Sequence, residues 1–151
     1  NKKSSLFKLF LSDVGMLTTI YGKATKLMIV NNEADINKGA IYENVIAQEL
    51  IAHGYSCYYY NNKKLGELDF VVEHMGKVLP IEVKSGKEYK KHSALDNVLQ
   101  KNNYGIKESI VFSNGNVEKK GKIAYLPIYM IMFLEEENID FADISIGKFK
   151  L

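Results

Sequence analysis

Residues 66–85 read GELDFVVEHMGKVLPIEVKS, and this stretch decides the fold. Two runs rich in valine, leucine and isoleucine flank the dipeptide Met75-Gly76, which predicts strands over residues 66–74 and 77–85 joined by a tight turn. A connection this short pairs its two strands antiparallel. The stretch therefore predicts a β-hairpin, and its flanking hydrophobic residues place it at the centre of a sheet.

Acidic side chains interrupt the first of these strands. Because side chains alternate between the two faces of a strand, Leu68, Phe70 and Val72 are expected on one face, and Glu67 and Asp69 on the other. A central strand is covered on both faces, so a carboxylate in it needs a partner or a function.

The second strand carries an acid and a lysine in the same way. Alternation sets Ile81 and Val83 on one face, and Glu82 and Lys84 on the other. Two carboxylates from adjacent strands, with a backbone carbonyl between them, provide the hard oxygen ligands that Mg²⁺ prefers. A metal held there would activate water and stabilise charge on a phosphodiester, and the lysine would orient that water or neutralise that charge.

A third acid is expected from the helix that precedes the sheet. Residues 39–53 have an apolar stripe in which Ile46, Ala47 and Leu50 follow Glu43 at three, four and seven positions. Glu43 should therefore lie on a sheet-facing flank and reach the two strand carboxylates. It could bind a metal directly or through water.

The rest of the chain predicts an α/β (α+β) protein, a mixed central sheet flanked by helices in the core order helix-strand-strand-strand-helix-strand. The other expected elements are a strand over residues 6–11, a helix from Asp13 to Tyr21, a partly helical stretch over 23–38, a strand over 55–60, a helix that begins at Ser93 and has a C-cap at Gly105, strands over 109–113 and 123–126, and a final helix from Pro127 to Glu136.

Composition narrows the classes of function. The 151 residues include 20 basic side chains, all of them lysine, and 18 acidic ones, which gives a net charge of +2. The absence of arginine argues against base-specific readout, which usually relies on bidentate guanidinium groups. Cys57 is the single cysteine, so no intramolecular disulfide forms and a reducing, cytoplasmic location is expected. No apolar run approaches the length of a membrane span, and no membrane partner is expected.

Four motifs carry a resemblance to known proteins: FLSDVGML at 10–17, KGAIYEN at 38–44, GELDF at 66–70 and IEVKSG at 81–86. Asp69 followed by Glu82-Val83-Lys84 resembles the PD-(D/E)xK signature of restriction-endonuclease-like nucleases. Together the motifs, from about residue 6 to about residue 134, resemble the uncharacterised C-terminal domain found behind an AAA-type P-loop ATPase domain in many bacterial and archaeal proteins.

This resemblance implies a restriction-endonuclease-like core with Glu43, Asp69, Glu82 and Lys84 as catalytic residues. It implies that the three acids would bind Mg²⁺ or Mn²⁺. It also implies a covalently attached upstream ATPase domain as a partner, so the chain is expected to be a C-terminal fragment of a longer ATPase. ATP would bind in that upstream domain, because this chain contains no G-x-x-x-x-G-K-[ST] loop. As one domain, it would comprise a lead-in over residues 1–38, a core over 39–137 and a tail over 138–151.

Residues around the site are expected to support it. Glu67 shares the face of Asp69, and Gln100 and Tyr104 are expected on one helix face, like a Gln-x-x-x-Tyr pair that some nucleases of the superfamily carry. The loop after the second strand contains Lys87, Lys90 and Lys91, which could contact a phosphate backbone. The expected partner is nucleic acid, with DNA favoured over RNA.

Simpler interpretations stay open. The strand acids and lysine could form a cross-strand ion pair worth at most ~1 kcal/mol if exposed. Gln100 and Tyr104 could be helix surface, and the lysine-rich loop could be solvated. The sequence therefore predicts a nuclease-like domain that hydrolyses phosphodiesters of nucleic acid with Mg²⁺. The alternative is a non-catalytic module of the ATPase that binds nucleic acid, regulates the ATPase or contacts another protein.

Overall fold

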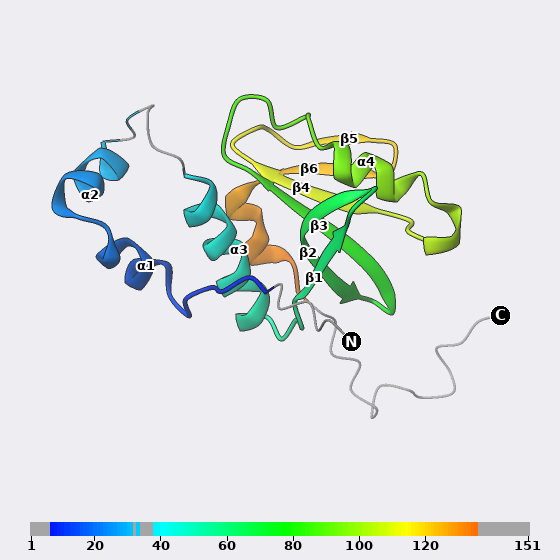
Figure 1. Ribbon diagram of the computed structural model, residues 1–151, viewed down its shortest axis with the longest axis horizontal. Helices are drawn as coiled ribbons and strands as arrows, with labels where there is room; N and C mark the ends of the chain where they lie inside the picture. The colour runs from blue at the N-terminus through cyan, green and yellow to red at the C-terminus, as the bar shows by residue number, and fades with distance from the viewer. Residues whose placement is uncertain (1–6, 32, 34–37, 136–151) are drawn as a thin grey trace.

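The computed structural model describes residues 7–31, 33 and 38–135, and within them a mixed six-stranded sheet separates two helical layers (Figure 1). The strand order is β1-β2-β3-β4-β6-β5. β3, β4 and β6 run parallel to one another, and the remaining neighbours pair antiparallel. The expected class, an α/β protein with a mixed sheet flanked by helices, is confirmed.

The central hairpin forms as expected. β2 (Gly66–His74) and β3 (Lys77–Lys84) pair antiparallel and occupy inner positions of the sheet. Met75 and Gly76 have φ values of 52° and 70°, the left-handed backbone of the tight turns that join hairpin strands. The hairpin turn and both strand boundaries thus follow from the local sequence to within one residue.

The remaining strands and helices surround this hairpin. They are α1 (Val14–Ile20), α2 (Lys23–Val30), α3 (Gly39–Ala52), β1 (Tyr58–Asn62), α4 (Ser93–Leu99), η1 (Asn102–Tyr104), β4 (Ser109–Ser113), β5 (Glu118–Lys120), β6 (Ile123–Pro127) and η2 (Ile128–Phe133). In Figure 1, α1 and α2 extend away from the sheet beyond α3. Among the described helices, none combines the length and apolarity needed to cross a membrane.

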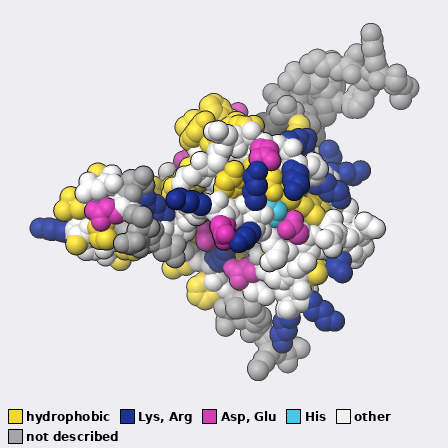
Figure 2. Space-filling view, turned by 90° about the horizontal axis from the view of Figure 1, so that it is seen from above, with side chains coloured by type: hydrophobic (Ala, Val, Ile, Leu, Met, Phe, Trp, Pro, Cys, Tyr) yellow, Lys and Arg dark blue, Asp and Glu magenta, His cyan; other side chains and the backbone are white. Residues whose placement is uncertain are grey.

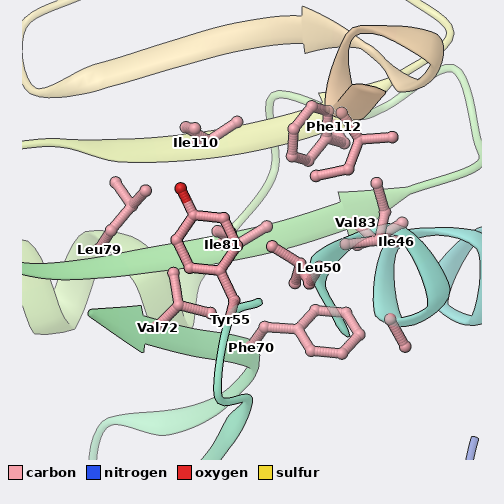
Figure 3. Packing of buried hydrophobic residues seen from close by; sticks show 12 residues of the cluster. Ile46, Leu50, Tyr55, Phe70, Val72, Leu79, Ile81, Val83, Ile110 and Phe112 are labelled. Atoms are coloured by element: carbon pink, nitrogen blue, oxygen red, sulfur yellow. The ribbon is translucent and has the colours of Figure 1, made fainter. Parts of the chain in front are cut away.

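The larger core lies between α3 and the sheet. The apolar stripe of α3 is buried as expected, and it packs on side chains from β2, β3 and β4 together with one residue of η2 (Figure 3). The buried members of this α3-side core are Ile46, Ala47, Leu50, Tyr55, Phe70, Val72, Leu79, Ile81, Val83, Ile110, Phe112 and Ile131.

A second core covers the other face, beneath α4. Leu95 and Val98 of that helix are buried with residues of β2, β4 and β6 on the sheet face opposite the α3-side core. The buried members of this α4-side core are Leu68, Leu95, Val98, Ile106, Val111, Ile123 and Tyr125. Both faces of β2 and β3 are therefore covered, which explains why their polar residues are constrained.

β2 departs from simple alternation at one point. Tyr60 pairs with Leu68 and Tyr58 with Val71, so β2 advances three residues where β1 advances two. This is a β-bulge, and the extra residue shifts the alternation of the side chains beyond it. The expectation that Leu68, Phe70 and Val72 share a face is wrong, because Leu68 joins the α4-side core and the other two join the α3-side core.

Two expected strand positions differ in the structure. Residues 7–11 of the predicted 6–11 strand form no strand; there the backbone N–H and C=O of Leu11 bond the side chain of Asn44 instead of a neighbouring strand. The 55–60 strand begins at residue 58, because Tyr55 still belongs to the end of α3. Its N–H donates to the Leu50 carbonyl across Gly54, whose φ is 86°.

The C-terminal part contains elements that the sequence pattern does not reveal. β5 consists of three exposed charged residues at a sheet edge, with no apolar alternation to mark it. The final helix is a 3₁₀ helix that buries only Ile131, and Gly105 ends η1 instead of α4. The core order therefore differs in detail from the expected one: η1 precedes β4, and β5, β6 and η2 follow it. Residues 136–151, and with them Glu136 and the predicted tail, lie outside the described residues.

We predict that Asn44→Ala loosens the lead-in segment and destabilises the protein by about 1–3 kcal/mol. The Asn44 amide is 2% exposed, and its oxygen and nitrogen satisfy the Leu11 N–H and C=O at 2.8 and 3.1 Å, so both backbone groups lose their partner. Urea unfolding measures the stability, and trypsin cleavage after Lys8 measures the loosening. The exposed Asn116→Ala is the control; equal stability and equal cleavage in both variants would contradict the role of Asn44.

Candidate functional site

Asp69 lies at the bulge of β2, where the β2–β3 ladder ends. The last paired residues are Phe70 and Ile81, and beyond them the Val83 N–H donates to the Asp69 carboxylate at 2.9 Å. Beyond the end of the ladder, the side chain of Asp69 thus links β2 to β3 in place of a backbone-to-backbone hydrogen bond. The bulge turns this half-buried carboxylate toward the α3 side of the sheet.

Lys8, a residue that the sequence analysis missed, lies at the centre of an acidic cluster. Its Nζ lies 2.9 Å from Asp69 Oδ1, 3.4 Å from Glu43 Oε2 and 3.2 Å from Glu67 Oε1. Only 21% of its side chain is exposed. One ammonium therefore contacts Glu43 of α3 and two acids of β2, Glu67 and Asp69; we call these four residues the Lys8 cluster.

The electrostatics of the Lys8 cluster are strongly coupled. Burial alone would lower the pKa of Lys8, but the hydrogen bond and charge of Asp69, with the charge of Glu43, hold that pKa above its ordinary value of 10.5. Burial and the negative charge of Asp69 raise the pKa of Glu43, against the opposing effect of Lys8. A hydrogen bond from Tyr59, and then Lys8, lowers the pKa of the more exposed Glu67.

Glu82 and Lys84 form a second group on β3. The Lys84 ammonium donates to Glu82 Oε1 at 2.6 Å, and Glu82 is 5% exposed. The other oxygen, Oε2, is buried and has no hydrogen-bond partner among the described residues. Burial and the charge of Asp69 raise the pKa of Glu82, and the contact with Lys84 offsets this only in part.

Asp69 connects the two groups. Its charge acts on Glu43 and on Glu82. By alternation Glu82 faces away from Ile81 and Val83, on the side of its β4 neighbour Val111. The structure therefore places Asp69 between two groups, with Lys8 and Glu43 on the α3 side and Glu82 with Lys84 on the other face of β3. Within the described ranges, however, no group of three or more acids, histidines or cysteines is arranged to hold a metal.

The supporting residues are divided between this site and another surface. Glu67 lies in the Lys8 cluster beside Asp69, as expected. The predicted shared helix face of Gln100 and Tyr104 is wrong, because α4 ends at Leu99 and Tyr104 belongs to η1. The Tyr104 hydroxyl instead lies 3.2 Å from that of Tyr60.

The lysines of the loop after β3 differ in their partners. Lys90 pairs with Glu118 at 2.5 Å and Lys91 with Glu88 at 2.6 Å, whereas no carboxylate in the described part of the chain pairs with Lys87. On the face drawn in Figure 2, lysine and acidic side chains lie interspersed. A continuous basic patch therefore does not form on that face.

One feature of the local sequence marks Lys8 as a residue that needs an acidic partner. It is the single charged residue in the apolar run LFKLFL at residues 6–11, where a strand was expected. A lone cation in an apolar run needs an anionic partner when the run packs on the protein. No local pattern indicates which acids would supply that partner, because those acids lie more than thirty residues away.

We predict a pH signature for the buried carboxyl groups. Folding raises the pKa of Glu82 and of Glu43 above the ordinary 4.5, so the folded state holds these protons more tightly than the unfolded chain. Their contribution favours folding below pH 4.5 and is lost as the pH rises through the raised values. Glu82→Gln should therefore weaken the fall in unfolding free energy that occurs as the pH rises above 4.5.

Urea midpoints across this pH range measure that fall. Glu108→Gln, at an exposed site, is the control and should leave the pH dependence unchanged. If the unfolding free energy of Glu82→Gln falls with pH as steeply as that of the unaltered protein, the buried carboxyl of Glu82 does not destabilise the folded state at higher pH.

The chain was compared with known proteins. Residues 38–131, more than half of the chain, match the family described as DUF4143, a domain of unknown function. Domains of this family are commonly found at the C-termini of AAA ATPases. No curated protein and no solved structure matches the chain. The matched segment contains Glu43, Asp69, Glu82 and Lys84, and the chain belongs to the DUF4143 family.

Proposed function

We propose that this domain hydrolyses phosphodiester bonds of nucleic acid with the help of Mg²⁺ or Mn²⁺, through Asp69, Glu82 and Lys84. The observation that carries the proposal is the carboxylate of Glu82. It is almost fully buried on a central strand, one oxygen lacks a hydrogen-bond partner among the described residues, and Asp69 is close enough to raise its pKa. Such a group costs stability, which favours a functional reason for keeping it.

The donor set suits a hard divalent cation. Mg²⁺ is usually held by one or two carboxylates together with waters and substrate phosphates, so Asp69 and Glu82 are sufficient without a full protein cage. Asp69 Oδ1 is engaged by Lys8, and its ammonium therefore occupies a cation position that a metal would share or take over. Glu43 lies on the other side of Lys8 and would assist from α3.

The chemistry then divides among the residues. A bound Mg²⁺ would supply an activated water and stabilise the negative charge that develops on the phosphodiester. Lys84 keeps its ammonium on the side of Glu82, with 31% of its side chain exposed, so it can contact a phosphate oxygen that approaches from solvent. Glu82 holds that ammonium in place, while the Val83 N–H fixes the carboxylate of Asp69.

The membership in DUF4143 supports a C-terminal position behind an ATPase domain. We propose that ATP binds in that upstream domain, and that this domain acts on DNA in preference to RNA. The resemblance of the four sequence motifs supports a restriction-endonuclease-like arrangement of the core.

A second function is favoured by the Lys8 cluster. With Lys8 bound, the charges of Glu43, Glu67 and Asp69 are partly compensated within the protein. The domain could then serve the ATPase as a non-catalytic module that binds nucleic acid or another protein. Nucleic-acid binding that is insensitive to Glu82→Ala, without cleavage, would favour this function.

We predict divalent-dependent cleavage of plasmid DNA that falls at least about 100-fold in Asp69→Asn, Glu82→Gln and Lys84→Met, the effect typical of losing one preorganised charge in a site. The assay compares Mg²⁺, Mn²⁺ and EDTA. Glu108→Gln and Lys101→Met, both exposed, are matched acid and lysine controls and should cleave normally. Cleavage that survives Glu82→Gln, or an absence of cleavage with both metals, would reject the catalytic proposal.

We also predict that Lys8→Met tightens Mn²⁺ binding at least about tenfold, equivalent to ~1.4 kcal/mol. The variant removes a positive charge from three carboxylates and frees Asp69 Oδ1, while it keeps the aliphatic stem. Electron paramagnetic resonance of free Mn²⁺ measures the affinity. Lys64→Met, at an exposed turn, is the control. Unchanged affinity in Lys8→Met would place the metal away from the Lys8 cluster.

A further inference from the structure

The parallel strands β3 and β4 end side by side, with Lys84 paired to Ser113 at their last position. The loops that follow them border an open cavity of about 260 Å³, lined by Ser85, Gly86, Lys87, Tyr89, Asn114 and Gly115. Crevices outside the carboxyl ends of parallel strands are the usual ligand positions in open α/β sheets. This cavity, which we call the loop cavity, begins one residue after Lys84.

The polar groups of the loop cavity are donors. Lys87 contributes an ammonium with no ion-pair partner in the described part of the chain, unlike Lys90 and Lys91. Ser85 contributes a hydroxyl. The Asn114 side-chain oxygen accepts a hydrogen bond from the Tyr42 hydroxyl at 2.9 Å, so its amide nitrogen is the group left to donate. Among the described residues, no acidic side chain lines the cavity.

The wall of the loop cavity is closely packed. A Cβ on Gly115 would lie 2.7 Å from the ring of Tyr89, so only glycine allows this ring to close the cavity. The N–H of Gly115 donates to the buried Ser113 hydroxyl at 3.0 Å, which fixes the turn. The bond from Tyr42, the residue before Glu43, ties the same turn to α3. The loop cavity is thereby anchored to the elements that carry the candidate catalytic residues.

We propose that the loop cavity binds a backbone phosphate of nucleic acid, held by Lys87 with Ser85 and Asn114. An anion suits a cavity lined by donors and a cation without acids, and the volume is below the roughly 300–1,000 Å³ of pockets that enclose a whole small ligand. It fits one phosphate with part of its sugar. The substrate class rests on the proposed function, but binding at this cavity does not require cleavage.

The test measures the affinity of a fluorescent DNA duplex by anisotropy in EDTA, over a series of KCl concentrations. Lys87→Ala should weaken binding several-fold and lower the slope of log affinity against log salt by about 0.9, the loss of one phosphate contact. Lys91→Ala, which removes an already paired lysine, and Lys107→Ala, at an exposed site outside the loop, should each change the slope by much less. Inorganic phosphate should compete with DNA for the unaltered protein and not for Lys87→Ala.

Gly115→Ala provides a variant without a change in charge. It displaces the Tyr89 ring and should weaken DNA binding, with urea midpoints to confirm that the protein still folds. Equal effects of Lys87→Ala, Lys91→Ala and Lys107→Ala, or no DNA binding by the unaltered protein, would overturn the proposal. Binding lost in Lys87→Ala without any cleavage by the unaltered protein would support the cavity and reject the nuclease. Cleavage by the unaltered protein, together with DNA binding that Lys87→Ala leaves unchanged, would support the nuclease and reject the cavity.

Discussion

The single extra residue that β2 accommodates at the bulge determines how the charged centre of this domain is built. Without it, Leu68 and Phe70 would share a face and the carboxylate of Asp69 would point away from α3. With it, Asp69 ends the β2–β3 ladder, bonds the N–H of Val83 by its side chain and reaches Lys8. Bulges often redirect side chains next to functional sites, and this one makes a single carboxylate a neighbour of acids that come from both sides of the sheet.

That placement carries an electrostatic cost which the protein offsets unevenly. Among the described residues, the three acids of the Lys8 cluster share one ammonium, and Lys84 bonds one oxygen of Glu82. The pKa values of Glu43 and Glu82 are both raised, so neither pairing fully compensates for burial and the charge of Asp69. If these ion pairs had only a structural role, apolar residues in their place would make the protein more stable, since buried pairs often stabilise less than hydrophobic residues of the same size. The uncompensated charge is the reason for proposing a ligand at this point.

Much of this arrangement could be predicted from local sequence, and the exceptions have physical causes. Alternation and the Met75-Gly76 turn predict the hairpin, and the stripe around Glu43 predicts the flank of α3 that Lys8 links to Asp69. The bulge is invisible because it depends on the pairing partner, β1, and not on β2 alone. Lys8 was missed because its acids are distant in sequence. β5 was missed because an exposed edge strand of charged residues has no apolar face to show. Long-range pairing, more than propensity, limits what the sequence predicts here.

The same long-range contacts link the lead-in segment to the site. Leu11 is bound at its backbone by Asn44, and three residues earlier Lys8 engages the acids, so residues 8–11 are attached at both ends to α3 and β2. If a cation takes Asp69 Oδ1 as proposed, it must displace the ammonium of Lys8 and weaken one of these two attachments. Linkage makes the coupling reciprocal: whatever shifts residues 8–11 changes the affinity of the cation by the same factor. A segment that precedes the core in sequence would thus set the charge state of the candidate site, although it contributes no catalytic residue.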